Sequence, residues 1–212
     1  MEAHRHRTSV EASDSDAVTV STRSTRDGFA WSITNGSTEE VSVTSVSAVC
    51  TLTGITGRVH MFRNGWQSWS ETAVATLGVD GDPARTPDAL ELMRMSQHPR
   101  SEVPPPDRLR SEMVTVLADD GGAVLAGFLG GDLHDGTLWL AHGRTGQELR
   151  IEAYLGGAVL SPGQKRDLHE VRLGPVDDPN GALADWAEEY GRRQVARTRS
   201  PYQLGWCSWY HY

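Results

Sequence analysis

The sequence is poor in cysteine and contains no long apolar run. Cys50 and Cys207 are its only cysteines. One ends an early β-type segment and the other lies near the end of the chain, so we expect both to be reduced. The N-terminal residues carry charge but no apolar stretch follows them, and nothing approaches the length of a membrane span. These absences exclude a disulfide-stapled secreted domain and a membrane-spanning protein, and they favour a cytoplasmic location.

An excess of positive charge and the familiar cofactor motifs are also missing. The formal net charge is -8, which argues against a nucleic-acid partner or an anionic membrane surface. The chain has no internal repeat, no glycine-rich phosphate loop, no zinc-ligand spacing and no serine nucleophile elbow. We therefore expect no metal and no cofactor, and a neutral substrate remains compatible with the charge.

Tryptophan is abundant, with seven residues in a chain of 212. Exposed tryptophan suits sugar binding because a flat indole stacks on the C–H face of a pyranose ring. Burial in the core is the alternative use of the same side chains. At this length an all-β chain commonly forms one domain.

The hydropathy pattern divides the chain into four parts. Residues 1–16 are polar, charged and rich in Ser and Asp, which predicts a flexible tail. Across residues 17–177 the apolar residues alternate in short runs separated by turn residues, which predicts an antiparallel β-sandwich. Residues 178–200 change to helical periodicity and predict a linker helix, and residues 201–212 form an aromatic-rich end segment.

Three local signals sharpen this prediction. Asn35-Gly36 lies between two apolar runs and predicts a hairpin turn. The alternation then slips by one residue, which predicts a β-bulge near Thr44. The clearest hairpin has Asp119 to Gly122 as its turn.

In the linker helix, Asp178 is a suitable N-cap before Pro179. The helical periodicity predicts an apolar face and an outward polar face. The apolar face contains Leu183, Trp186, Ala187 and Tyr190, and the polar face contains Asp185, Glu188 and Glu189.

The end segment, Gly205-Trp-Cys-Ser-Trp-Tyr-His-Tyr212, has the apolar density of a strand covered on both faces. Such strands belong to parallel sheets, whose members are joined by crossovers. A (β/α)8 barrel needs roughly 250 residues. We therefore expect this strand to open a barrel that is truncated here, and the chain to be the N-terminal part of a larger protein.

A second tryptophan-rich segment is Asn64-Gly-Trp-Gln-Ser-Trp-Ser70, which follows a strand-like run. Asn64-Gly65 is a turn dipeptide, so Trp66 and Trp69 fall on a loop or strand edge. Indole stacking combined with the amide of Gln67 suits a carbohydrate ligand. Packing of both tryptophans in the core or against another domain is the alternative.

Both segments, in this order, resemble motifs of the α-galactosidases (melibiases) of glycoside hydrolase family 36. The resemblance implies an N-terminal β-supersandwich, a (β/α)8 catalytic barrel, and hydrolysis of terminal α-galactosyl groups of melibiose- or raffinose-type oligosaccharides. It implies that Trp209 and Tyr210 face the galactose subsite and that Trp66 or Trp69 adds an aromatic wall. The family's two catalytic aspartates lie on later barrel strands, so it also implies that residues 1–212 contain no catalytic residue and are inactive alone.

Two other interpretations stay open on the sequence. The chain is compatible with a non-catalytic carbohydrate-binding β-sandwich, and with an oligomerisation domain that has no ligand. Members of the family often assemble as tetramers through the N-terminal domain, so the resemblance also allows a homo-oligomer.

Overall fold

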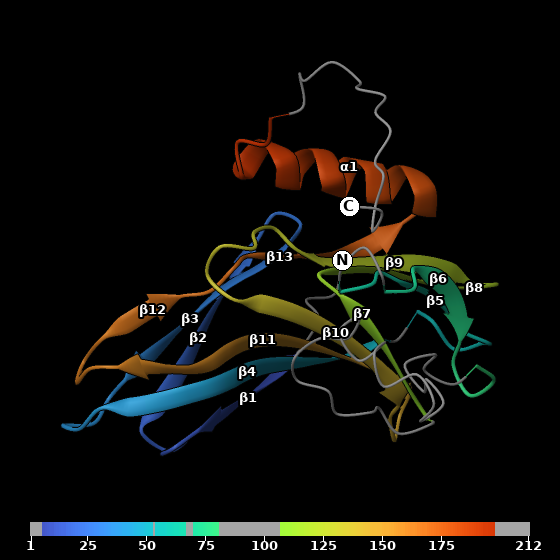
Figure 1. The fold of residues 1–212 in the computed structure, drawn as a ribbon. Helices are drawn as coiled ribbons and strands as arrows, with labels where there is room; N and C mark the ends of the chain where they lie inside the picture. The colour runs from blue at the N-terminus through green and yellow to red at the C-terminus, as the bar shows by residue number, and fades with distance from the viewer. Residues whose placement is uncertain (1–5, 53, 67–69, 81–106, 198–212) are drawn as a thin grey trace, which may run out of the picture.

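The structure, a computed structural model, describes residues 6–52, 54–66, 70–80 and 107–197. These residues form two antiparallel sheets and one helix (Figure 1). The five-stranded sheet has the order β1 (His6–Ala12), β4 (Val41–Leu52), β11 (Gln147–Leu160), β10 (Asp135–His142) and β7 (Arg108–Glu112). The eight-stranded sheet has the order β12 (Lys165–Asp167), β3 (Gly28–Asn35), β13 (Val171–Val176), β9 (Gly122–Phe128), β8 (Val114–Asp119), β5 (His60–Arg63) and β6 (Ala73–Thr76), with β2 (Val18–Thr25) paired to β3. The predicted antiparallel β-sandwich followed by a helix is confirmed.

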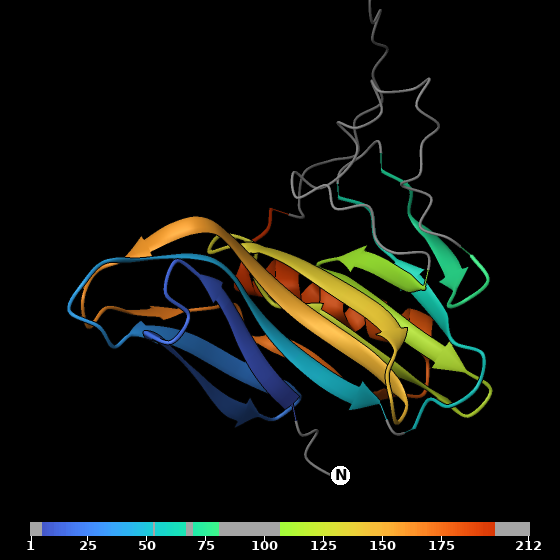
Figure 2. The ribbon, with the colours of Figure 1, turned by 90° about the horizontal axis from the view of Figure 1, so that it is seen from below.

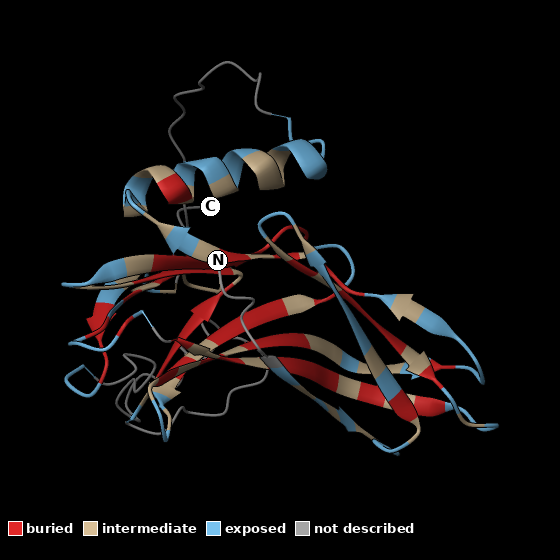
Figure 3. Cartoon of the chain, turned by 180° about the vertical axis from the view of Figure 1, so that it is seen from behind, coloured by how far each residue is buried: buried red, intermediate tan, exposed pale blue. Residues whose placement is uncertain are grey.

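The core lies between the two sheets and is supplied by alternate residues of each strand. Ala48 and Cys50 of β4 and Ile151 of β11 are fully buried on one side, and Ile33 of β3 and Phe128 of β9 are fully buried on the other. Figure 3 shows buried positions, coloured red, on strands of both sheets. Burial raises the pKa of the free Cys50 thiol to about 12, so this cysteine acts as a small apolar side chain.

The prediction of a flexible tail is wrong for residues 6–12. They form β1, which pairs antiparallel with β4 from His6↔Cys50 to Ala12↔Val43. Val10 and Ala12 pack against the core. The segment has few apolar residues, but the backbone of an otherwise open strand edge supplies partners for its hydrogen bonds. The partner strand β4 is distant in the sequence, so the residues near β1 do not indicate that the two strands pair.

The predicted hairpin at Asn35-Gly36 is also wrong, because β3 and β4 belong to different sheets. The connection crosses the sandwich and is organised by the buried side chain of Asn35. Its Nδ2 donates to the carbonyl oxygens of Glu39 at 2.7 Å and Leu160 at 3.0 Å, and its Oδ1 accepts from the backbone N–H of Ser37. The predicted bulge is confirmed: Ser45 and Val43 pair with consecutive residues of β1, which leaves Thr44 as the extra residue.

The hairpin between β8 and β9 is confirmed, with Asp119↔Gly122 as its last pair. The Asp119 carboxylate accepts hydrogen bonds from the backbone N–H groups of Thr56 and Gly57 and of Gly121 and Gly122. These bonds, led by the one from Gly57, lower the pKa of Asp119. One carboxylate therefore ties the hairpin turn to the loop before β5.

The helix α1 (Pro179–Arg193) begins where the sequence predicts, with Asp178 Oδ1 accepting from the backbone N–H of Asn180 at 3.0 Å. It ends at Arg193, short of the predicted residue 200, and Val195 beyond it has a left-handed φ of 51°. Figures 1 and 2 show α1 on the eight-stranded sheet, on the side away from the five-stranded sheet.

The face that α1 turns toward the sheet differs in part from the prediction. Leu183 and Trp186 pack on Val116 and Leu125 of the sheet as predicted. Ala187 is exposed, and Ala182 is the buried alanine. Glu189, predicted to point outward, is half-buried and pairs with Arg172 of β13.

Candidate functional site

The first predicted site segment leaves the eight-stranded sheet at the end of β5. Asn64 follows β5 directly and is tied to β7 by three hydrogen bonds. Its backbone N–H donates to Ser111 Oγ at 2.7 Å, its Nδ2 donates to the carbonyl oxygen of Glu112 at 3.0 Å, and its own carbonyl oxygen accepts from the Glu112 N–H at 3.0 Å. Asn64 is therefore fixed before the chain reaches Trp66.

The strands beneath this loop are fixed by buried polar side chains. Arg63, which is 7% exposed, donates through Nε to the carbonyl oxygen of Arg110 at 3.0 Å. Ser111 Oγ donates to the carbonyl oxygen of Val114 at 2.6 Å, across the corner where the chain passes from β7 to β8. Met113 forms that corner with a left-handed φ of 65°, so the chain changes sheets within one residue.

The two ends of the loop meet at Gly65. A Cβ atom there would lie 2.6 Å from Ser70 Cβ and 2.9 Å from the Ser70 carbonyl oxygen, so only glycine allows this approach. The Gly65 N–H donates to Thr72 Oγ1 at 3.2 Å. Trp66 comes next in the chain and is half-buried. The structure thus places Trp66 directly after a tightly packed turn base formed by Asn64, Gly65 and Ser70.

Three of the four predicted site residues, Trp69, Trp209 and Tyr210, lie outside the described residues. The structure therefore places one of the four, Trp66. The prediction that the two tryptophan-rich segments meet at one sugar subsite stays a prediction.

Sequence reasoning missed the polar residues beside this loop. Arg110 and Glu112 of β7 are 7% and 4% exposed. Glu112 Oε2 accepts from Thr137 Oγ1 at 2.8 Å, and Glu112 Oε1 lies 3.6 Å from Arg110 Nε. The signal was an Arg-x-Glu spacing, which recurs at Arg150 and Glu152 on β11. On a strand this spacing puts both charges on one face.

A second polar cluster joins two buried histidines. His134 Nε2 accepts from the backbone N–H of His169 at 3.0 Å, and its Nδ1 lies 2.8 Å from the Asp135 carbonyl oxygen. His169 Nε2 accepts from the backbone N–H of Leu133 at 2.9 Å. An acceptor nitrogen must be unprotonated, so both rings are neutral. Burial lowers the pKa of His134 to about 4 and also lowers that of His169.

This cluster is structural. Asp132 Oδ1 is 3.7 Å from His169 Nε2, but each histidine Nε2 is already occupied by a backbone N–H. Among the residues that the structure describes, no group of three or more His, Cys, Asp and Glu side chains could hold a metal ion. None of the helices in the described ranges has the length and apolarity needed to cross a membrane.

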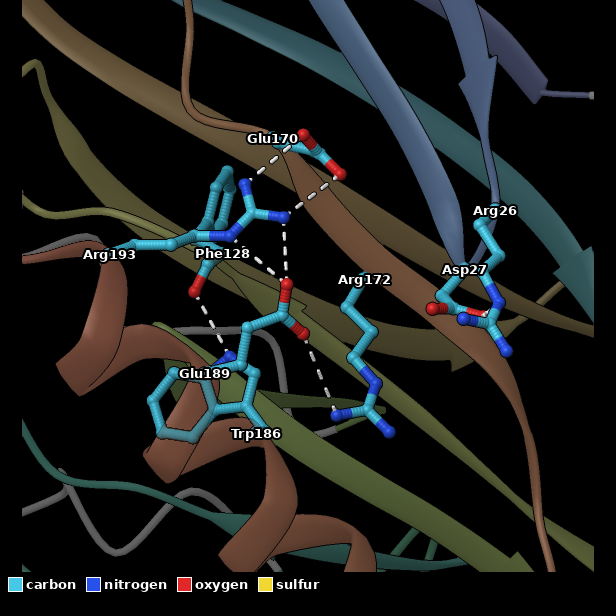
Figure 4. Close-up of polar contacts among 8 residues, drawn as sticks. All are labelled: Arg26, Asp27, Phe128, Glu170, Arg172, Trp186, Glu189 and Arg193. Carbon is cyan, nitrogen blue, oxygen red and sulfur yellow. Dashed lines mark hydrogen bonds and ion pairs between the residues drawn. The ribbon is translucent and has the colours of Figure 1, made fainter.

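The point where the chain leaves the sandwich is fixed by Arg193 in the last turn of α1 (Figure 4). Its guanidinium donates to Glu189 Oε1 from Nη2 at 2.7 Å and to Glu170 Oε2 from Nη1 at 3.2 Å. Hydrogen bonding to Glu170, and then to Glu189, raises the pKa of Arg193. Because Glu170 directly precedes β13, this network locks the end of the helix to the eight-stranded sheet.

Comparisons with known proteins found no matching family model and no matching curated protein. Similar solved structures include the following two. One is the galactosidase domain of the α-galactosidase–sucrose kinase AgaSK, with 10% identity, a TM-score of 0.49, and coverage of 94% of this chain and 31% of that chain. The other is the GH36 α-galactosidase AgaA from Geobacillus stearothermophilus, in complex with stachyose, with 11% identity, a TM-score of 0.45, and coverage of 88% and 24%. This chain spans less than a third of the length of either structure.

Proposed function

We propose that this chain is the N-terminal part of a retaining α-galactosidase that removes terminal α-galactosyl groups from melibiose- or raffinose-type oligosaccharides. The observation that carries the proposal is the Asn64-Gly-Trp loop. Its sequence resembles the family 36 motif, and the strand before it, the bonds from Asn64 and the close contact at Gly65 give it a rigid base. The aromatic segment from Gly205 to Tyr212 supports the same assignment by resemblance.

In this proposal the sandwich and α1 precede a (β/α)8 barrel that begins near residue 201, and the protein works in the cytoplasm. Retaining hydrolysis uses two carboxyl groups about 5 to 5.5 Å apart, one as nucleophile and the other as acid and then base. Both belong to later barrel strands, so residues 1–212 support the site and are inactive alone. No metal or cofactor takes part, and subunits associate through the N-terminal domain.

The role of the sandwich is to orient the sugar. Trp66 or Trp69 forms an aromatic wall against the C–H face of galactose, and Trp209 and Tyr210 line the subsite from the first barrel strand. An indole next to an anchored backbone contributes because the anchoring limits its positions before substrate binds. This explains why the strands at the base of the loop are anchored by buried polar groups.

The proposal is tested by assaying the full-length parent and the 212-residue chain side by side on p-nitrophenyl α-galactoside and raffinose. We expect hydrolysis by the parent with retention of the anomeric configuration, followed by proton NMR of the first-formed sugar, and no hydrolysis by the chain alone. A parent that is active on β-galactosides or α-glucosides only, or that inverts configuration, would refute the assignment.

A further inference from the structure

The outer face of the five-stranded sheet carries two ordered rows of polar and aromatic side chains. On β11, β10 and β7, Trp139 is the cross-strand partner of both Arg150 and Arg110. In the next row of the same face, Thr137 is the partner of both Glu152 and Glu112. Leu138, Leu140 and Leu149 point into the core, so the intervening residues point out. We name these six residues, Arg110, Glu112, Thr137, Trp139, Arg150 and Glu152, the Arg–Trp–Glu face.

Each arginine of the Arg–Trp–Glu face is paired along its own strand. Arg110 faces Glu112, with Nε and Oε1 3.6 Å apart, and Arg150 forms an ion pair with Glu152. Arg150 also donates through Nε to Ser47 Oγ of β4 at 2.9 Å. The residues Glu112 and Glu152 are 4% and 3% exposed. Both glutamates are therefore largely removed from solvent, and each lies against the arginine of its own strand.

Trp139 and Arg150 are the two members of the Arg–Trp–Glu face that are only partly buried. Trp139 is half-buried, and the Arg110 guanidinium carbon lies 5.7 Å from the ring centroid, which fixes the orientation of the indole. The Arg150 side chain is 39% exposed. A guanidinium has five N–H donors, and Ser47 and Glu152 accept from its Nε and Nη2. The remaining guanidinium N–H groups of Arg150 can therefore donate hydrogen bonds to a ligand beside the indole of Trp139.

We propose that the Arg–Trp–Glu face is a non-catalytic binding site for a neutral pyranose unit of a glycan. Trp139 stacks on the C–H face of the sugar, Arg150 donates hydrogen bonds to its hydroxyls, and Glu112 and Glu152 position the two arginines. The net charge of -8 on the chain favours a neutral sugar over an acidic one. The site lies on the opposite sheet from α1 and does not depend on the proposed hydrolytic activity.

The test is calorimetric titration of the 212-residue chain with methyl α-galactoside, raffinose, maltotriose and galacturonate. We expect binding of at least one neutral saccharide, weaker binding of galacturonate, and a loss of affinity of at least about tenfold in Trp139→Ala and in Arg150→Met. Trp139→Phe keeps a ring and should lose less. Matched controls on the other sheet, Trp186→Phe and Arg172→Met, should bind as the unchanged chain does.

Three outcomes would overturn the proposal: no neutral saccharide binds the chain, Trp139→Ala binds normally, or galacturonate binds as well as its neutral counterpart. Should Trp139→Ala fail to fold, the indole N–H resonance of Trp139 in the unchanged chain decides, and it must shift during the titration. Binding that is lost in Trp66→Ala and kept in both Trp139→Ala and Arg150→Met would refute this site while supporting the proposed function. An inactive full-length parent would refute the proposed function and leave this site standing.

Discussion

Trp186 donates its indole N–H to the carbonyl oxygen of Phe128 at 3.0 Å, which joins α1 to the last residue of β9. The contact requires a residue without a side chain beside Phe128. A Cβ atom on Gly127 would lie 2.5 Å from Trp186 Nε1 and 3.1 Å from Val114 Cγ2. The hydrogen bond from Trp186 and the absence of a side chain at Gly127 thus help to position the helix on the sheet, together with the network of Arg193 in its last turn.

Gly127→Ala should therefore displace the helix and destabilise the domain by about 1 to 3 kcal/mol, the range for overpacking a well-packed contact. The matched control is Gly174→Ala on the neighbouring strand β13, where an added Cβ meets no atom within 4 Å. Urea unfolding followed by tryptophan fluorescence measures both variants. Equal stability of the two alanine variants would show that the contact between α1 and β9 tolerates a side chain at residue 127.

Asn35→Ala should cost about 2 to 4 kcal/mol, because it removes the donor to two carbonyl oxygens and the acceptor for Ser37 from a fully buried site. Ser37→Ala is the control, since it removes one hydroxyl from the same turn and leaves the bond to Leu160 intact. Thermal unfolding of both variants measures the difference. A Ser37→Ala loss as large as that of Asn35→Ala would place the stabilisation in the turn and not in the bond between the connection and β11.

Acidification should weaken the domain through His134. Its folded pKa is about 4, below the unfolded value of about 6.5, so the unfolded state binds the proton more readily. The contribution of neutral His134 to the free energy of unfolding is therefore complete above the unfolded pKa. It falls by about 3 kcal/mol in all as the pH drops from the unfolded pKa to the folded pKa. His169 acts in the same direction, because burial lowers its pKa too. Asp119, whose pKa is lowered, loses stabilisation only at more acidic pH, below its unfolded value of about 3.9.

Urea unfolding at a series of pH values from 7 to 5 checks this prediction. His134→Gln removes the titrating ring and keeps a hydrogen-bonding side chain, so its stability should vary less over this range. A variant whose free energy of unfolding falls as steeply as that of the unchanged chain would assign the acid sensitivity to other groups.

Local signals explain which parts of the fold could be predicted. The hairpin at Asp119, the bulge at Thr44 and the Asp178 cap depend on residues close in sequence, and the structure has all three. The sheet that each strand joins depends on distant partners. For that reason the sequence predicts a tail where β1 lies and a hairpin at Asn35-Gly36, because the residues of the first segment are polar and those of the second are turn-forming.

The candidate site was predicted unevenly for the same reason. Trp66 stands out because it lies in a recognisable sequence motif. The Arg–Trp–Glu face is instead assembled from the hairpin strands β10 and β11 and from β7, which is separated from them in sequence. Two Arg-x-Glu pairs are unremarkable until the register places Trp139 between their arginines. Cross-strand register is set by the whole sheet, so a single strand's sequence does not contain it.

The last prediction concerns Trp66 in the full-length parent. Trp66→Ala should lower kcat/KM for p-nitrophenyl α-galactoside by tenfold to a hundredfold, equivalent to about 1 to 3 kcal/mol of transition-state stabilisation. The melting temperature should change little, because the loop base is held by Asn64 and by glycine contact at Gly65, which the substitution leaves in place. Trp66→Phe keeps a stacking surface and should recover part of the activity. If Trp66→Ala instead keeps full kcat/KM and melts several degrees lower, Trp66 is a packing residue and the aromatic wall must be sought elsewhere.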